Sequence, residues 1–500
     1  MVSLFKSEAL AVIMVIAFAS TTVSCIEDDF DICNTMVKNW AASSLDAKNK
    51  EDKLKLQDLL FFLHIPRTGG RTYFHCFLRK LYTSSQECPR SYDKLRFDPS
   101  KPNCRLMVTH DDYSMMSKLP KERTSVVTIL RSPVDRVFST YEFSVEVAAR
   151  FLVHPNLSSA TQMTRRLKPK SRGVSTLDIW PWKYLVPWMR EELFARRDTR
   201  KGGRAMELRE IADTYNMRDI MMPLHVFINE PLAHDIIHNG ATFQVAGLTN
   251  NSCIEESHKV RHCVRKHSEL GQYVLEVAKK RLDQMLYVGL TENHKESATM
   301  FADVVGAQIL SQLQELANQQ KQLADNVTGP LSSLQDHETE DLNNLQSATD
   351  DQKNGEVPNV ENVDATNENI TVAQLMEAYE VCISSLRKSQ AVRRASSLKR
   401  ISPAKFSKEA RRNVPENVIQ QILTLNSLDV ELYKHAQAIF AEQQKLLIDS
   451  QSKEARLKVT YNDLQCPLLK VSLAAMALLF LLISMVLLIR SRRRTSKLKI

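Results

Sequence analysis

Short apolar runs alternate with segments of helical periodicity over residues 59–324. After Leu59–Ile65, for example, the segment Thr72–Tyr82 repeats its apolar positions at helical spacing. Short buried strands that alternate with helices predict an α/β fold, a parallel sheet with flanking helices. The predicted strands are Leu59–Ile65, Leu106–Thr109, Ser125–Leu130, Phe243–Leu248 and Met285–Leu290, and the last leads into a long helix that continues to about residue 324.

The pattern breaks at residues 336–368, which hold ten acidic residues, a single Lys and almost no large apolar side chain. Such a segment cannot bury enough apolar surface to fold, so it is predicted to be an acidic disordered insertion. Helical periodicity returns at Gln374, and 418–446 predicts two helices. We therefore expect a folded domain in two parts, 25–335 and 369–446, followed by a stalk at 447–470.

The two ends of the chain predict targeting segments. Residues 1–24 have Lys6, an apolar core and a small, polar end, which is the form of a signal peptide. Residues 471–489 are 19 residues without a charge, enough for one transmembrane helix. The tail 490–500 then carries six cations and no acid, which predicts a cytosolic tail and a type I topology with residues 25–470 outside the cytosol.

The charge of the whole chain is basic. It has 500 residues, 67 Lys plus Arg against 58 Asp plus Glu, and a net charge of +9. The tail contributes six positive charges, and the acidic insertion contributes negative charges that offset them. The excess of positive charge therefore comes partly from the cytosolic tail and partly from a basic folded domain. A basic domain suits a polyanionic cofactor and an acidic acceptor, and nucleic acid is not predicted as a partner.

The sharpest motif follows the first predicted strand and precedes a helix. Its glycine pair lets the backbone approach an anion closely, and Arg and Thr side chains add charge and hydroxyl donors. It does not fit the Walker A pattern, which disfavours a Mg-nucleotide hydrolase. A plain strand-to-helix turn is the alternative. The predicted anion-binding residues are Ile65, Pro66, Arg67, Thr68, Gly69, Gly70, Arg71 and Thr72.

A second motif follows the strand Ser125–Leu130. Arg131 ends this strand, and Ser139 lies about two turns into a helix that begins at Pro133, so both side chains are expected at the carboxyl edge of the sheet near one phosphate. Arg136 is interpreted as a solvated charge on that helix.

Together the motifs resemble the heparan sulfate 6-O-sulfotransferases. These carry a loop of the form H-I-x-K-T-G-G-T-T, an H-A-D-W stretch, L-R-D-P-V-x-R-x-x-S, G-L-T-E and a C-terminal L-D-x-x-L-Y helix. The C-terminal anchor is in addition similar to that of the plant tyrosylprotein sulfotransferases. The matching segments here, in the same order, are HIPRTGGRT (64–72), HDDY (110–113), LRSPVDRVFS (130–139), GLTE (289–292) and LDVELY (428–433).

The resemblance implies a PAPS-sulfotransferase fold of the P-loop-like type and a Golgi membrane enzyme with a lumenal catalytic domain. The donor would be PAPS (3′-phosphoadenylyl sulfate), and the acceptor tyrosine in acidic segments of secreted precursors. His110 is implied as the base, with Glu142 in reserve, and Arg131 and Ser139 as ligands of the 3′-phosphate. A polysaccharide acceptor and a non-catalytic type I receptor remain the alternatives.

The sequence departs from the 6-O pattern where an acceptor is expected to lie. Arg67 replaces the loop Lys, Ser132 replaces Asp, and Tyr113 replaces Trp. No metal is predicted, because the spacing between Cys253 and Cys263 lacks a CxxC pair. These two cysteines are interpreted as one disulfide or as two unrelated thiols.

Overall fold

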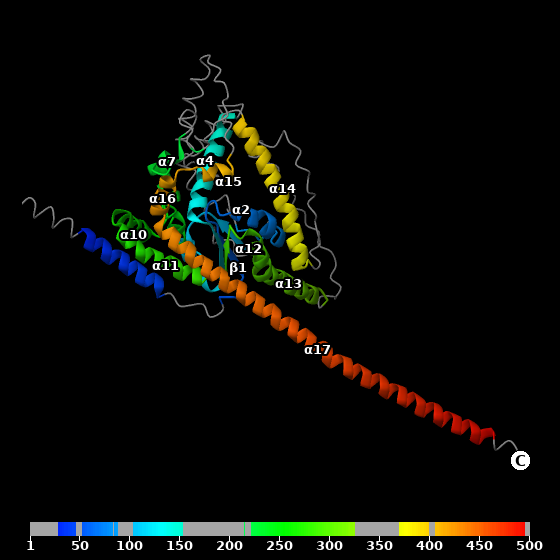
Figure 1. Cartoon of the computed structure of the whole chain (residues 1–500). Coiled ribbons are helices and arrows are strands. Elements are labelled where there is room, and N and C mark those ends of the chain that lie inside the picture. The colour runs from blue at the N-terminus through cyan, green and yellow to red at the C-terminus, as the bar shows by residue number, and fades with distance from the viewer. Residues whose placement is uncertain are drawn as a thin grey trace, which may run out of the picture. The chain divides into compact units, whose positions relative to one another are not determined.

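The computed structural model describes residues 29–46, 53–83, 85–88, 104–153, 215, 222–325, 370–399 and 406–495. Figure 1 draws the fold. The predicted signal peptide (1–24) and acidic insertion (336–368) lie outside these residues, as does the basic, tryptophan-bearing stretch 155–205. The chain divides into two compact units, Met1–Ile439 and Phe440–Ile500.

A four-stranded sheet with the order β2-β1-β3-β4 forms the centre of the first unit. All neighbouring strands are parallel, as predicted, with Phe61 opposite both Met107 and Val126. Every residue of every strand is buried, which explains the unbroken apolar runs in the sequence. The strands are β1 (Leu59–Leu63), β2 (Leu106–Thr109), β3 (Thr124–Leu130) and β4 (Tyr287–Leu290).

Helices cover the sheet. In Figure 1, α10 and α11 lie to the left of the strands and α12, α13 and α14 to the right. The α-helices are α2 (Gly70–Tyr73), α3 (Arg79–Leu81), α4 (Pro133–Val153), α7 (Leu224–Phe227), α8 (His234–Ile237), α9 (Gly240–Val245), α10 (Glu255–Lys266), α11 (Gly271–Asp283), α12 (His294–Phe301), α13 (Ala307–Asp325), α14 (Val372–Lys399), α15 (Lys408–Arg412), α16 (Glu416–Leu425) and α17 (Ser427–Thr495). The π-helical turns are η1 (Phe74–Leu78) and η7 (Ala302–Gly306), and the 3-10 turns are η2 (Tyr113–Ser117), η3 (Lys121–Arg123), η5 (Pro231–Ala233) and η6 (Ser268–Leu270).

The helix α4 joins the two parts of the folded domain. Pro133 stands at its first position, where the missing N–H of proline costs nothing. Its buried side chains Phe138 and Tyr141 pack in one apolar cluster with Phe227 of α7 and Ile422 of α16. The C-terminal helices are therefore part of the same core as the strand-bearing part, although the predicted acidic insertion separates them in sequence.

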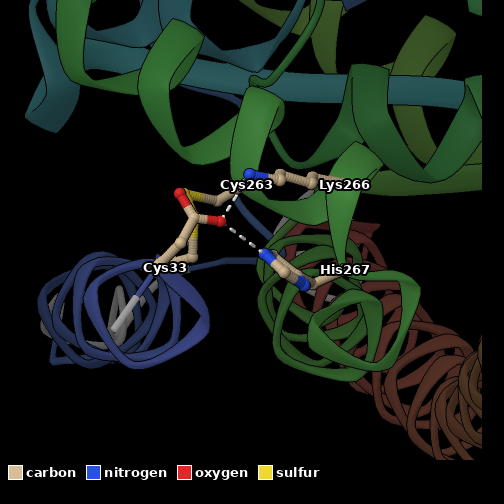
Figure 2. Close-up of a disulfide and its surroundings, with 5 residues drawn as sticks. Cys33, Cys263, Lys266 and His267 are labelled. Carbon is tan, nitrogen blue, oxygen red and sulfur yellow. Dashed lines mark hydrogen bonds and ion pairs between the residues drawn. A yellow bond between two sulfur atoms is a disulfide. The ribbon is translucent and has the colours of Figure 1, made fainter. Parts of the chain in front are cut away.

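Within the described residues, three disulfides form: Cys33–Cys263 and Cys76–Cys382 join segments 230 and 306 residues apart, and Cys88–Cys104 joins two segments only 16 residues apart. Cys253 is a free thiol, so the predicted disulfide alternative for Cys253 and Cys263 is wrong. The sequence could not reveal this pairing, because the partner of Cys263 is 230 residues away. Figure 2 shows the Cys33–Cys263 bond, which holds the helical residues 29–45 against α10.

One predicted strand is wrong. Residues 240–245, at the start of the run Phe243–Leu248, form helix α9, and no residue of this run is in a strand. The N–H groups of Ala241 and Thr242, at the start of α9, donate to the Asp429 carboxylate of α17 at 3.2 and 2.7 Å. A short apolar run fits a strand or a buried helix equally well, and this cap comes from a residue far away in the sequence.

Arg136 is not a solvated charge. Its side chain is only 2% exposed, and its guanidinium donates to Asp429 and to the carbonyl of Ile236, both at 2.7 Å. A cation buried in an α/β core needs such a partner, because an unpaired buried charge is strongly destabilising. The prediction failed because the partner lies 293 residues away.

The C-terminal segment forms two helices as predicted, α16 and α17. The second is longer than expected, because α17 continues through the predicted stalk to Thr495. Across the described residues, no helix has an apolar stretch long enough to cross a membrane.

Candidate functional site

The loop after β1 has the shape that its glycines allow. Arg67 and Gly69 have positive φ angles of 69° and 84°. A Cβ on Gly70 would lie 2.3 Å from the His64 ring, so only glycine fits there without a shift of the ring. Inside the loop, the Thr68 hydroxyl donates to the carbonyl of Ile65 at 2.8 Å. The loop is thus a tight turn that leads directly into α2.

The other predicted loop residues differ in their exposure to solvent. Ile65 and Pro66 are buried beneath the turn, and Thr68 is 1% exposed. The backbone N–H of Thr72 donates to the carbonyl of Gly69 at 2.9 Å. Arg71 is exposed at the start of α2. The buried members therefore shape the turn, and Arg71 presents its charge to solvent.

Arg131 and Ser139 lie at the same edge of the sheet, as the sequence predicts, and Arg67 contacts both of them, which it did not predict. The Arg67 Nε donates to the Ser139 Oγ at 3.0 Å, and the Arg131 Nη1 donates to the Arg67 carbonyl at 3.1 Å. The Arg67 guanidinium also lies over the ring of Phe143, 4.3 Å from its centroid. Two cations and a hydroxyl from separate elements thus meet at the carboxyl edge of the sheet.

Residues after β4 and in α17 complete this cluster, although the sequence assigned no role to them. The Glu292 carboxylate accepts from the Ser132 N–H at 2.9 Å and from the Tyr433 hydroxyl at 2.7 Å. It lies 4.0 Å from the Arg131 Nε. The Thr291 hydroxyl lies 2.7 and 3.0 Å from the carbonyl oxygens of Thr68 and Leu130, which share its one proton. The GLTE and LDVELY segments therefore support the two predicted anion-binding motifs.

His110 follows β2 at the same edge. Its Nδ1 lies 2.9 Å from the carbonyl of His64, and because a carbonyl accepts only, Nδ1 carries the proton and Nε2 the lone pair. The rings of His110 and His64 are 4.2 Å apart. Burial, with a further contribution from the charge of Arg67, lowers the pKa of His110 to about 4 despite the His64 hydrogen bond. His110 is therefore a neutral imidazole whose tautomer is set by the β1 loop.

The segment after His110 is fixed by a buried carboxylate. Asp112 is fully buried and accepts from the N–H and hydroxyl of Thr249, both at 2.8 Å, and from Ser114. Burial raises the pKa of Asp112, and these hydrogen bonds oppose that rise. Asp112 thus connects the segment after β2, which carries His110, to Thr249 just after α9 by hydrogen bonds.

Glu142 does not point into this site as a separate group. Its side chain is only 5% exposed and pairs with the Arg411 guanidinium at 2.7 Å. The same carboxylate accepts from the Tyr215 hydroxyl at 2.6 Å. Arg411 also bonds Asp135 at 2.9 Å. The contacts of Glu142 are those of a structural carboxylate that holds α15 to α4.

One group of metal-ligand side chains occurs elsewhere in the described part of the chain: Asp29, Cys33 and His267. The sulfur of Cys33 is bonded to Cys263, and the Asp29 carboxylate bonds Lys266 at 2.6 Å and His267 at 3.1 Å (Figure 2). In this form the group is a disulfide flanked by an ion pair, with no thiolate to offer a metal.

No protein-family model matches the chain. Over 496 residues, the chain is 54% identical to the protein-tyrosine sulfotransferase of Arabidopsis thaliana, and the match covers 96% of this chain and 97% of that protein.

Proposed function

We propose that the chain, which belongs to the protein-tyrosine sulfotransferase family, transfers the sulfuryl group of PAPS to a tyrosine hydroxyl. The acceptor tyrosines lie in acidic segments of secreted precursors. The donor, the acidic context of the tyrosine and the residue roles are parts of this proposal. The near full-length match to a protein-tyrosine sulfotransferase favours a tyrosine acceptor over a polysaccharide.

One observation carries the assignment of the site. Loops after all four strands converge at one edge of the sheet, and they bring Arg67, His110, Arg131 and Thr291 from β1, β2, β3 and β4. In parallel α/β sheets, ligands bind outside the carboxyl ends of the strands. Two arginines at this edge suit a donor with a phosphosulfate and a 3′-phosphate.

The residues present fit PAPS in two respects. First, the buried Arg131 Nε makes no hydrogen bond to any residue that the structure describes, so it is a donor available for an anion after a small movement. Second, the exposed Gly69 directly before α2 has no side chain, and the nearest atom to a Cβ built there is the Thr291 methyl group at 4.0 Å, so the start of α2 is open on this side to an anion. Arg67 and the loop 65–72 would hold the phosphosulfate, and Arg131 and Ser139 the 3′-phosphate.

PAPS, when bound, supplies the sulfuryl group and leaves as PAP. His110 takes the proton of the tyrosine hydroxyl on Nε2, while its Nδ1–H stays on the carbonyl of His64. A phenol, with a pKa near about 10, releases this proton more readily than a sugar alcohol. The positive charge of Arg67 stabilises the negative charge that develops on the donor side.

We also propose a type I location in the Golgi membrane, with the folded domain in the lumen. Its support is the uncharged stretch 471–489 followed by six cations, together with exposed apolar side chains in this part of α17, such as Phe480 at 78% exposure. The three disulfides agree with an oxidising compartment. Protease protection of sealed membrane vesicles tests this location: the tail after residue 490 should be cleaved and the folded domain protected.

The activity is tested on the full-length chain in detergent, with sulfur-labelled PAPS and either a peptide containing Asp-Tyr or a desulfated heparan chain. Label on tyrosine is expected. Label on the glycan alone would instead support the polysaccharide acceptor, and no transfer together with no PAPS binding would refute the enzyme. His110→Ala should abolish transfer while PAPS binding remains, and unchanged turnover would remove His110 from its role.

A further inference from the structure

Gln244 of α9 lies beneath the two histidines of the site, in the segment for which the sequence predicted a strand. It is fully buried. Its amide Nε2 lies within hydrogen-bond distance of three backbone carbonyls, those of His110 at 3.0 Å, Asp111 at 3.1 Å and His64 at 3.2 Å, so that its two N–H groups are shared among three acceptors. One side chain therefore joins the loop after β1 to the loop after β2.

The carbonyl of His64 links Gln244 to the imidazole of His110. This oxygen accepts from the Gln244 amide and from the His110 Nδ1, so it uses both of its lone pairs. The same oxygen thus fixes the tautomer of His110 and is itself fixed by Gln244. A shift of the His64 carbonyl would move the imidazole with it.

The orientation of the Gln244 amide leaves one buried polar atom without a hydrogen bond to the described residues. The Gln244 Oε1 is buried and makes no hydrogen bond to the described residues. A flipped amide would point this oxygen at three carbonyl oxygens, so the network dictates the orientation. An apolar side chain of similar length would avoid the buried unsatisfied oxygen, and its absence here points to a role beyond packing.

Helix α9 is itself held at both ends. Asp429 accepts from the N–H groups of Ala241 and Thr242 at its start, and Asp112 accepts from Thr249 just beyond its end. The backbone that carries Gln244 is therefore held in place by hydrogen bonds at both ends of α9. A change at Gln244 should move the carbonyls that it binds and leave the helix in place.

We propose that Gln244 is a positioning residue, which acts through the carbonyls of His64 and His110 to hold the His110 imidazole for proton transfer. The inference rests on the proposed role of His110 as the base. It predicts a change in the catalytic step rather than in donor binding, because none of the three carbonyls belongs to Arg67, Arg131 or Ser139.

The test uses the full-length chain and steady-state kinetics with PAPS and an Asp-Tyr peptide. Gln244→Met keeps the length of the side chain and removes both N–H donors, so kcat should fall about tenfold or more with KM for PAPS within about twofold of the wild type. A matched control is Gln308→Met in α13. Gln308 also makes three hydrogen bonds, to Leu54, Leu56 and Val304, but at the opposite edge of the sheet, so its replacement should lower the melting temperature and leave kcat unchanged.

A second variant gives a signature that a purely structural role would not produce. In Gln244→Glu, the protonated carboxyl still donates one hydrogen bond, whereas the carboxylate repels the three carbonyls. Burial raises the pKa of such a carboxyl, so the kcat of this variant relative to wild type should fall as the pH rises from about 5 to about 8. The same ratio for Gln244→Met should stay flat.

The outcomes separate the two proposals. If the wild type transfers no sulfate or His110→Ala remains active, the proposed function or its base is wrong. If His110→Ala is inactive and both Gln244 variants keep wild-type kcat at every pH, Gln244 has no positioning role.

Discussion

The guanidinium of Arg136 donates to the carboxylate of Asp429 at 2.7 Å, and both side chains are 2% exposed. The two residues belong to the motifs LRSPVDRVFS and LDVELY, which are far apart in the sequence. Asp429 also caps α9, the helix that carries Gln244. The ion pair thus connects helix α4, the C-terminal helix α17 and helix α9, whose Gln244 contacts the backbone of His110.

Asp429→Ala should be strongly destabilising. The variant leaves the Arg136 charge buried without its partner, which typically costs about 3–5 kcal/mol. Denaturant unfolding of the full-length chain measures this loss. Glu431→Ala, two residues away on the exposed face of α17, is the control and should leave the unfolding midpoint unchanged. A midpoint shift of equal size in both variants would contradict a special role for the buried pair.

The glycine pair in the β1 loop gives a second prediction. Gly70→Ala should weaken binding of PAP by about tenfold or more, because the new Cβ would meet the His64 ring at 2.3 Å and displace the turn. At Gly69 the nearest atom would be 4.0 Å away, and the cost there is the strained φ of 84°, about 1–2 kcal/mol. Calorimetric titration with PAP and thermal unfolding compare the two. Tighter or equal binding by Gly70→Ala would show that the turn is not the anion cradle.

The activity should lack a titration near the usual pKa of histidine. Burial lowers the pKa of His110 to about 4, so the imidazole stays neutral as the pH falls through 6.5. A profile of kcat/KM against pH should therefore be flat on its acid side down to about pH 5. An inflection near pH 6.5 would contradict this and would mean that the working enzyme does not keep the buried environment of His110.

Acid should also destabilise the fold, because three histidines have lowered pKa values in the folded state. Burial lowers the pKa of His75, His110 and His238 to about 4, below the value of 6.5 for an unfolded chain. Between these values the unfolded state binds more protons, so stability is complete above about pH 6.5 and is lost as the pH falls toward 4. Melting temperatures from about pH 7 to about pH 4.5 check the direction.

Glu142→Gln tests whether the Glu142 carboxylate has a structural or a catalytic role. Loss of the charge weakens the bonds to Arg411 and Tyr215, and stability should fall by about 2 kcal/mol. Arg411→Met removes the other half of the pair and should cause a similar loss. The acid side of the profile of kcat/KM against pH should be unchanged in both variants. A profile altered only by Glu142→Gln would indicate that Glu142 is the base.

The sequence predicted the four strands of the sheet and the turn after β1 because their signals are local. Each strand is a short apolar run with both faces buried, and the β1 loop is a contiguous motif whose glycines fit one backbone shape. Arg131 and Ser139 were placed together because one ends a strand and the other lies on the helix that follows. Resemblance to a known family supplied His110.

The errors have non-local causes. Arg136 looks like an exposed helix charge until Asp429 is placed beside it, and α9 looks like a strand until the same carboxylate caps it. Gln244 gave no signal at all, because its three acceptors are backbone carbonyls 133 to 180 residues away. A single chain does not record such pairings in its residue pattern.

The Cys76–Cys382 bond has a consequence for the continuity of the backbone. It joins η1 to α14, and the acidic segment 336–368 lies between these two cysteines in sequence. A cut within that segment would leave two polypeptides that stay covalently linked until a reductant breaks the disulfide. The disulfide and the main chain together form a closed covalent ring that includes the insertion, so an unbroken main chain is not required to keep the C-terminal helices attached to the strand-bearing part.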